Sequence, residues 1–168
     1  KVAKDNITVV NNGIDTEIFK PLPQIERVAE TIMTTSSADS PLKGLPYLLK
    51  AVAGLTEEFP NLHLNILGKL NEGGTASKLI EELELGSKVS FFSDISTSEI
   101  VMLYAKASCA VVPSLYEGFG LPAGEAMACQ VPVVSTDGGA LPEVVGEAGL
   151  IVSTGDHKAL GESIAYFL

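Results

Sequence analysis

Residues 111–145 of the chain read VVPSLYEGFGLPAGEAMACQVPVVSTDGGALPEVV, and the rest of the sequence is interpreted around this stretch. The apolar run that reaches Val112 predicts a buried strand, Pro113 to Leu121 a loop, and Pro122 to Cys129 a helix whose first position is proline. Such a junction points backbone N–H groups and the positive end of a helix dipole into one crevice. The stretch therefore predicts a phosphate-binding junction.

Strand-like and helix-like segments alternate along the rest of the chain. A short β-like run over Ile7 to Val10 comes first, and further strands are predicted over 28–35, 62–68, 88–92, 108–112, 131–134 and 150–152. Helices are predicted over 44–59, 76–85, 122–129, 141–145 and 158–168, with another that begins after an N-cap at Ser96 or Ser98. About six alternations are typical of a parallel sheet covered on both faces. We therefore expect an α/β fold with a doubly wound parallel sheet of about six strands.

Composition limits the classes of partner. The chain has 168 residues, of which 46% are hydrophobic, and this is enough for one domain with a real core. A net charge of −10 argues against nucleic acid or an anionic membrane surface as the main partner. Cys109 and Cys129 each lie in an apolar run, so both are expected to be small core residues in a reducing compartment. These features predict a cytoplasmic domain.

The two ends of the sequence suggest a piece of a longer protein. The chain begins at Lys1 rather than Met, and it stops at the apolar cluster Tyr166 to Leu168, where a helix usually closes with polar or capping residues. No apolar run approaches the ~20 residues of a membrane helix, and no signal-peptide pattern opens the chain.

Several glycine-bearing or charged loops follow predicted strands directly. In an open parallel sheet, ligands lie at the carboxyl ends of the strands, where such loops run into helices. We expect these loops to line one pocket. They are Ser36 to Lys43, Gly68 with Lys69, Ser93 to Ile95, and Glu117 to Leu121.

The glycines of the central loop suit a diphosphate. Gly118 and Gly120 lack a Cβ atom, so the chain can bring its N–H groups close to an anion. The spacing Gly-x-Gly-x-x-x-Gly through Gly124 is one residue longer than the dinucleotide fingerprint, and the neighbouring Glu117 would repel a phosphate unless it faces another group. A nicotinamide-dependent oxidoreductase is therefore disfavoured.

Two carboxylates flank this loop. Vicinal hydroxyls of ribose and hexoses are good partners for carboxylates, so Glu117 and Glu125 are positioned to grip opposite ends of a sugar nucleotide. In the alternative interpretation, Glu125 in the first helical turn only complements the helix dipole and Glu117 is a solvated loop residue. Tyr116 and Phe119 are expected to pack rather than stack on a ligand, although Phe119 is placed to shape a sugar pocket.

These residues resemble a known family. Glu117 and Glu125, with seven residues between them, are similar to the Glu-x7-Glu signature of the retaining glycosyltransferases of family 4, which have the two-domain GT-B architecture. Lys43-Gly44 before LPYLLKAVAGL resembles the family's Lys-Gly helix opening. A third match, to the Asn-Gly-hydrophobic-Asp segment at the domain entrance, is carried by Asn12, Gly13, Ile14, Asp15, Phe19 and Pro21. The resemblance spans nearly the whole chain, and it implies a Rossmann-like domain, 1–168, that is the C-terminal, donor-binding half of a GT-B fold.

The resemblance also implies roles. Glu125 would accept the ribose hydroxyls of a nucleotide diphosphate sugar, and Glu117 those of the transferred hexose. Lys43 would neutralise the departing diphosphate, where negative charge grows as the glycosidic bond breaks. The remaining implied contacts are the N–H groups of Gly118, Phe119, Gly120 and Leu121 to sugar and diphosphate, the backbone near Ser93 to Ile95 to the base, and Gly68 and Lys69 on the pocket wall. No cofactor or obligatory metal is implied, and the acceptor site would lie in an N-terminal domain absent from this chain.

One departure from the family pattern concerns positive charge. The family usually has an arginine about five residues before the lysine, and Ala38 occupies that position here, while Arg27 is the only arginine in the chain. Either Lys69 or the other domain supplies a second cation, or the protein transfers sugar poorly. Asn11, where proline is more usual, carries no expected consequence. A nucleotide-sugar-binding module without transferase activity therefore remains the alternative, and the sequence identifies neither base, sugar nor acceptor.

Overall fold

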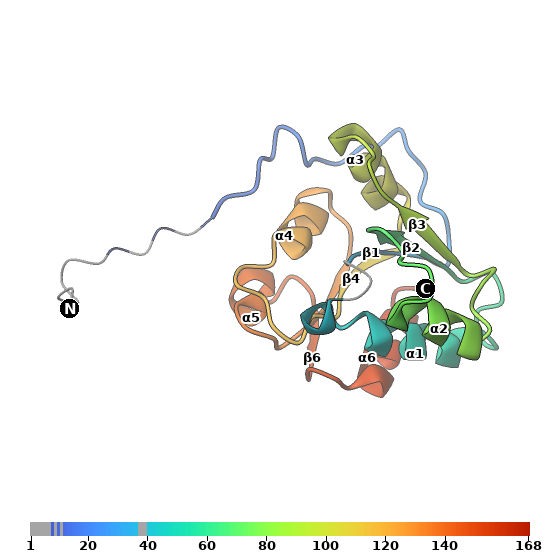
Figure 1. Ribbon diagram of the computed structural model, residues 1–168. Coiled ribbons are helices and arrows are strands. Elements are labelled where there is room, and N and C mark those ends of the chain that lie inside the picture. Colours follow the sequence, from blue (N-terminus) through green and yellow to red (C-terminus); the bar gives the residue numbers. More distant parts are fainter. Residues whose placement is uncertain (1–7, 9, 11, 37–39) are drawn as a thin grey trace, which may run out of the picture.

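Six parallel strands form one sheet in the order β3-β2-β1-β4-β5-β6 (Figure 1). The computed structural model describes Thr8, Val10, and residues 12–36 and 40–168. The strands are β1 (Thr31–Thr35), β2 (His63–Leu67), β3 (Val89–Phe92), β4 (Cys109–Val112), β5 (Val133–Thr136) and β6 (Leu150–Val152). The helices are the 3-10 helix η2 (Pro41–Lys43) and α1 (Leu45–Leu55), α2 (Thr75–Glu82), α3 (Thr97–Lys106), α4 (Leu121–Ala128), α5 (Leu141–Val145) and α6 (His157–Ala165). The predicted doubly wound α/β fold is confirmed.

Alternating side chains of the central strands build two cores. In β1, Ile32 packs with α1, α2 and α6, whereas its neighbour Met33 packs with α3, α4 and α5. In β4, Val111 joins the first core and Ala110 the second. One group of three helices therefore covers each face of the sheet (Figure 1), and every residue of β4 and β5 is buried.

The order of the strands determines which loops lie together at the carboxyl ends of the sheet. Successive strands run outward from β1 to β3, and the chain then returns to add β4 on the other side of β1. The pairing of Ile32 with Cys109 joins these two halves. In sheets of this type, ligands bind where the order reverses, at the carboxyl ends of the strands. The loops after β1 and β4 meet at this switch point.

The segment before β1 is tied to the opposite edge. Arg27 donates from Nη1 to the carbonyl of Ala107 at 2.7 Å and from Nη2 to that of Gln130 at 2.5 Å. Ala107 and Gln130 precede β4 and β5, so Arg27 lies at the amino ends of the strands. The only arginine of the chain therefore lies at the edge opposite to the switch point and supplies no charge there.

Some predicted boundaries differ from the structure. Helix α1 ends at Leu55 rather than Phe59, and Pro41–Lys43 form a 3-10 turn where a loop was expected. Thr8 and Val10 lie in no strand, while Ile7, Asn11 and Ala38 fall outside the described residues. Within 12–36 and 40–168, no helix has the length and apolar character needed to cross a membrane.

Candidate functional site

Lys43 and Glu117 meet at the switch point. Lys43 ends η2, Glu117 lies in the loop after β4, and Lys43 Nζ is 2.5 Å from Glu117 Oε1. The hydroxyl of Ser114 donates to the same carboxylate oxygen at 2.9 Å. The lysine and glutamate predicted from the sequence as site residues are therefore direct partners. Glu117 thus faces a cation, as the sequence required for a glutamate next to a predicted phosphate site.

Backbone contacts set the relative position of these two side chains. Gly44 has φ +66°, and a Cβ atom on it would lie 1.8 Å from the carbonyl oxygen of Pro113. The N–H of Leu115 donates to the carbonyl of Leu42 at 2.8 Å, and the N–H of Ala140 donates to that of Glu117 at 2.9 Å. The loops after β1, β4 and β5 are thus joined main chain to main chain.

The loop from Gly118 to Leu121 presents unused donors. Within the described residues, none of its four N–H groups donates a hydrogen bond to another part of the protein. Gly120 is needed by the fold, because it has φ +94° and a Cβ atom there would lie 2.6 Å from the Leu141 side chain. Gly118 borders open space, and a Cβ atom on it would meet nothing within 4 Å. The loop therefore offers donors and room for a ligand before α4.

Helix α4 differs from the prediction at its start. Leu121 is its first residue, so Pro122 takes the second position rather than the first. Glu125 consequently lies in the second turn, and the first turn holds no acidic residue. Since the dipole acts mainly within the first turn, a role for Glu125 as a mere dipole complement is not supported.

The hydroxyl of the buried Tyr104 side chain contacts the Glu125 carboxylate. The Tyr104 hydroxyl lies 3.3 Å from both Glu125 Oε2 and the carbonyl oxygen of Pro122. Burial raises the pKa of the Glu125 carboxyl, and the hydrogen bond from Tyr104 partly opposes this shift. Burial, followed by the nearby Glu125 charge, raises the pKa of Tyr104 as well, so the phenol keeps its proton and acts as the donor.

The other predicted residues line the same edge but lie farther away. β2 and β3 are two and three strands from β4, which corresponds to about 10 and 14 Å. The N–H of Gly68 donates to the carbonyl of Phe92 at 2.8 Å, and Lys69 is exposed. Ile95 lines a separate cavity of about 180 Å³ with Phe92, Glu99, Met102 and Leu103. Ile95 thus lies in a different cavity from Ser40 and Leu115, and the expectation that all of these loops line one pocket stays a prediction.

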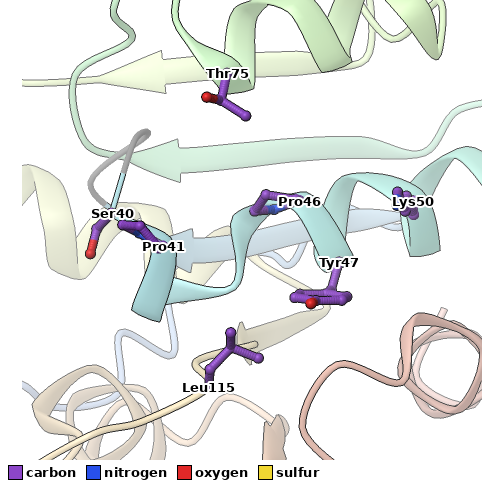
Figure 2. Close-up of a pocket in the computed structure, with 7 residues that line it drawn as sticks. All are labelled: Ser40, Pro41, Pro46, Tyr47, Lys50, Thr75 and Leu115. Carbon is purple, nitrogen blue, oxygen red and sulfur yellow. The ribbon is translucent and has the colours of Figure 1, made fainter.

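A larger cavity of about 360 Å³ lies beside the start of α1. Figure 2 shows that Tyr47 of α1 points toward Leu115 in the loop after β4, with Ser40 and Pro41 at one side. Thr75, Pro46 and Lys50 complete its lining. Neither Lys43 nor Glu117 lines this cavity, although Pro41 and Leu115 belong to the segments that carry them.

Ser114 and Tyr104, the hydrogen-bond partners of Glu117 and Glu125, were not predicted from the sequence. Ser114 precedes Glu117 by three residues, and Tyr104 was expected only as an inward-facing residue of α3. The inward position of Tyr104 was a usable signal, since a buried phenol needs a hydrogen-bond partner. The expectation that Tyr116 packs is wrong, because its side chain is 61% exposed.

Several known proteins are similar to this chain in sequence or in fold. The sequence model of the family described as glycosyl transferases group 1 matches residues 19–168. The chain is 45% identical over 148 residues to an MMP alpha-(1->4)-mannosyltransferase of Mycolicibacterium hassiacum, covering 88% of this chain and 35% of the relative. Among solved structures, sucrose-phosphate synthase from Thermosynechococcus elongatus superposes with a TM-score of 0.75 at 30% identity, covering 92% of this chain and 41% of that one. Anabaena HepE, solved with UDP and glucose, gives a TM-score of 0.79 at 24% identity, with 95% and 46% covered.

Proposed function

Because the chain belongs to the glycosyl transferases group 1 family, we propose that residues 1–168 are the C-terminal, nucleotide-sugar-binding domain of a retaining glycosyltransferase. The whole protein transfers a hexose from a nucleotide diphosphate sugar to an acceptor held by an N-terminal domain. The observation that carries the proposal is the run of four unused N–H donors from Gly118 to Leu121, beside the Lys43–Glu117 pair. The chain spans less than half of the mannosyltransferase and synthase it matches, which supports its assignment as one domain of two.

The diphosphate lies over the start of α4 in this proposal. The N–H groups of residues 118–121 and the helix dipole meet its oxygens, and Lys43 turns from Glu117 toward it. Negative charge on the diphosphate grows as the bond to the sugar breaks, so these groups stabilise the transition state more than the bound donor. Lys43 and the N–H groups supply this stabilisation without a metal.

The two glutamates then hold the two ends of the donor. Glu117 accepts hydroxyl hydrogens of the sugar, and the half-buried Glu125 accepts those of the ribose. The base reaches toward Ile95, about 14 Å from β4 in the sheet, with Gly68 and Lys69 between. HepE in complex with UDP and glucose supports a ligand of this class on the same fold.

Titration with UDP, GDP and ADP and with their sugar conjugates tests the proposal. We expect saturable binding of one nucleotide, weakened in Glu125→Ala and unchanged by a chelator. Exposed Glu147→Ala serves as the matched control. No saturable binding to any nucleotide, with Glu125→Ala behaving as the parent does, overturns it. Anomeric analysis of the product made by the full-length protein tests retention, and we expect this domain alone to transfer nothing.

A nucleotide-sugar-binding module without transferase activity is the second candidate. The observation that favours it is the single cation at the site: within the described part of the chain, Lys43 alone pairs with a site carboxylate, and Arg27 lies at the other edge. This candidate predicts that the full-length protein binds nucleotide but shows no turnover with any donor, whereas measurable transfer excludes it.

A further inference from the structure

Glu117 is held at one oxygen by two different groups. Lys43 Nζ and Ser114 Oγ lie 2.5 and 2.9 Å from Oε1. Oε2 accepts no hydrogen bond from any described residue. The carboxylate therefore has one occupied oxygen and one that is available to a ligand.

The two holding groups differ in their freedom to move. The Lys43 side chain is 32% exposed and sits on a flexible four-carbon stem, whereas Ser114 is only 2% exposed. If Lys43 turns to the diphosphate, as proposed above, its bond to Glu117 is lost. The Ser114 hydroxyl is then the remaining anchor of Oε1.

Ser114 is itself fixed by the neighbouring strand. The hydroxyl of Thr136, at the end of β5, donates to the carbonyl of Ser114, and Thr136 is only 2% exposed. The N–H of Gly138 lies 3.4 Å from the Thr136 hydroxyl, so this group is also bound from the loop after β5. The anchor of Glu117 thus extends into the sheet.

We infer that Ser114 is a positioning residue for Glu117: it keeps Oε1 in place while the donor is bound, so that Oε2 faces the sugar hydroxyls. The inference rests on the proposed function. It predicts that Ser114 affects recognition of the sugar and leaves recognition of the nucleotide unchanged. A residue that only stabilises the fold would affect both alike.

The test compares affinities for paired probes: UDP with UDP-glucose, GDP with GDP-mannose, and ADP with ADP-glucose. For the pair that binds, Ser114→Ala lowers the preference for the conjugate by about tenfold, the value of one hydrogen bond to a charged group, and leaves the affinity for the sugarless nucleotide unchanged. Ser135→Ala is the matched control, since Ser135 is equally buried and donates to the Thr136 carbonyl at 3.0 Å without touching Glu117. Ser114→Cys, a weak donor of similar size, gives an intermediate preference and serves if the alanine variant does not fold.

Glu117→Gln distinguishes a failure of the positioning role of Ser114 from a failure of the proposed function. If this variant loses the preference for the conjugate while Ser114→Ala and Ser114→Cys keep it, the positioning role is refuted and the proposed function stands. If Glu117→Gln keeps the preference, the proposed contact between Glu117 and the sugar is wrong, and the inference fails with it. Binding of no probe overturns both.

Discussion

Lys43 and Glu117, 74 positions apart in the sequence, form an ion pair 2.5 Å long at the point where the strand order reverses. The cation proposed for the diphosphate is therefore occupied by the carboxylate proposed for the sugar. Under the proposed function, donor binding exchanges these partners, so we expect each group to affect the binding of the other's ligand.

The first prediction concerns stability. Glu117 is the more buried partner, with a side chain 12% exposed against 32% for Lys43. Lys43→Met leaves a carboxylate short of a partner, and we expect a loss of about 1–2 kcal/mol in the free energy of unfolding. Lys43→Met combined with Glu117→Gln recovers most of this loss, because no charge is left unpaired. Urea unfolding of both variants checks this; equal stability of the single and double variants contradicts it.

The second prediction concerns nucleotides without sugar. Glu117→Gln frees Lys43 from its ion pair, so a nucleoside diphosphate no longer has to break that pair. We expect its affinity to rise by up to about fivefold, the value of a partly exposed ion pair. Calorimetric titration measures the change, with Glu147→Gln as an exposed control. An affinity at or below that of the parent shows that Lys43 does not turn to the diphosphate.

The third prediction compares two glycines at the ends of one helix. Gly44→Ala places a Cβ atom 1.8 Å from a backbone oxygen at a positive φ, and we expect a loss of about 3 kcal/mol or more. Gly54→Ala adds a Cβ atom with nothing within 4 Å inside α1, and we expect a gain of about 0.5 kcal/mol. Thermal or urea unfolding distinguishes the two, and similar effects of both would contradict the close approach at Gly44.

The fourth prediction concerns pH. Burial raises the pKa of Glu125 above its ordinary value of 4.5, so the folded chain holds this proton more tightly than the unfolded chain does. Ionisation as the pH rises through the folded-state pKa therefore disfavours folding. Glu125→Gln is expected to be more stable than the parent at neutral pH, and this advantage fades as the pH falls toward 4.5. Urea unfolding across this range measures it, and a constant difference between the two proteins contradicts the raised pKa.

Much of the fold follows from the sequence because burial on both faces leaves a strong local pattern. Helix α5 (Leu141–Val145) and the less buried edge strand β6 (Leu150–Val152) were also predicted with the bounds that the structure has. Errors occurred where tertiary contacts decide the end of an element. The 3-10 turn ends at Lys43, and its C-cap Gly44 has a left-handed conformation close to the backbone of Pro113, which is far away in the sequence.

The sequence predicted which residues belong to the candidate site, but it did not predict which of them contact one another. Spacing within one loop placed Glu117 beside Gly118 and Gly120, since these neighbours are local in sequence. The Lys43–Glu117 bond joins two loops after adjacent strands, and strand order was not available from local pattern. The separation of Ile95 from the central loop has the same origin, because β3 lies at the far end of the sheet.

The close approach of Gly44 to Pro113 also determines which substitutions the carboxyl edge of the sheet tolerates. The loops that carry Lys43 and Glu117 are aligned through main-chain atoms, and Leu115 donates to the Leu42 carbonyl whatever side chains surround them. Exposed side chains such as Leu42, Tyr116 and Leu121 are thus replaceable without moving the frame. Under the proposed function, we expect point substitutions at these exposed positions to change donor preference without loss of the fold, so directed evolution is best confined to them.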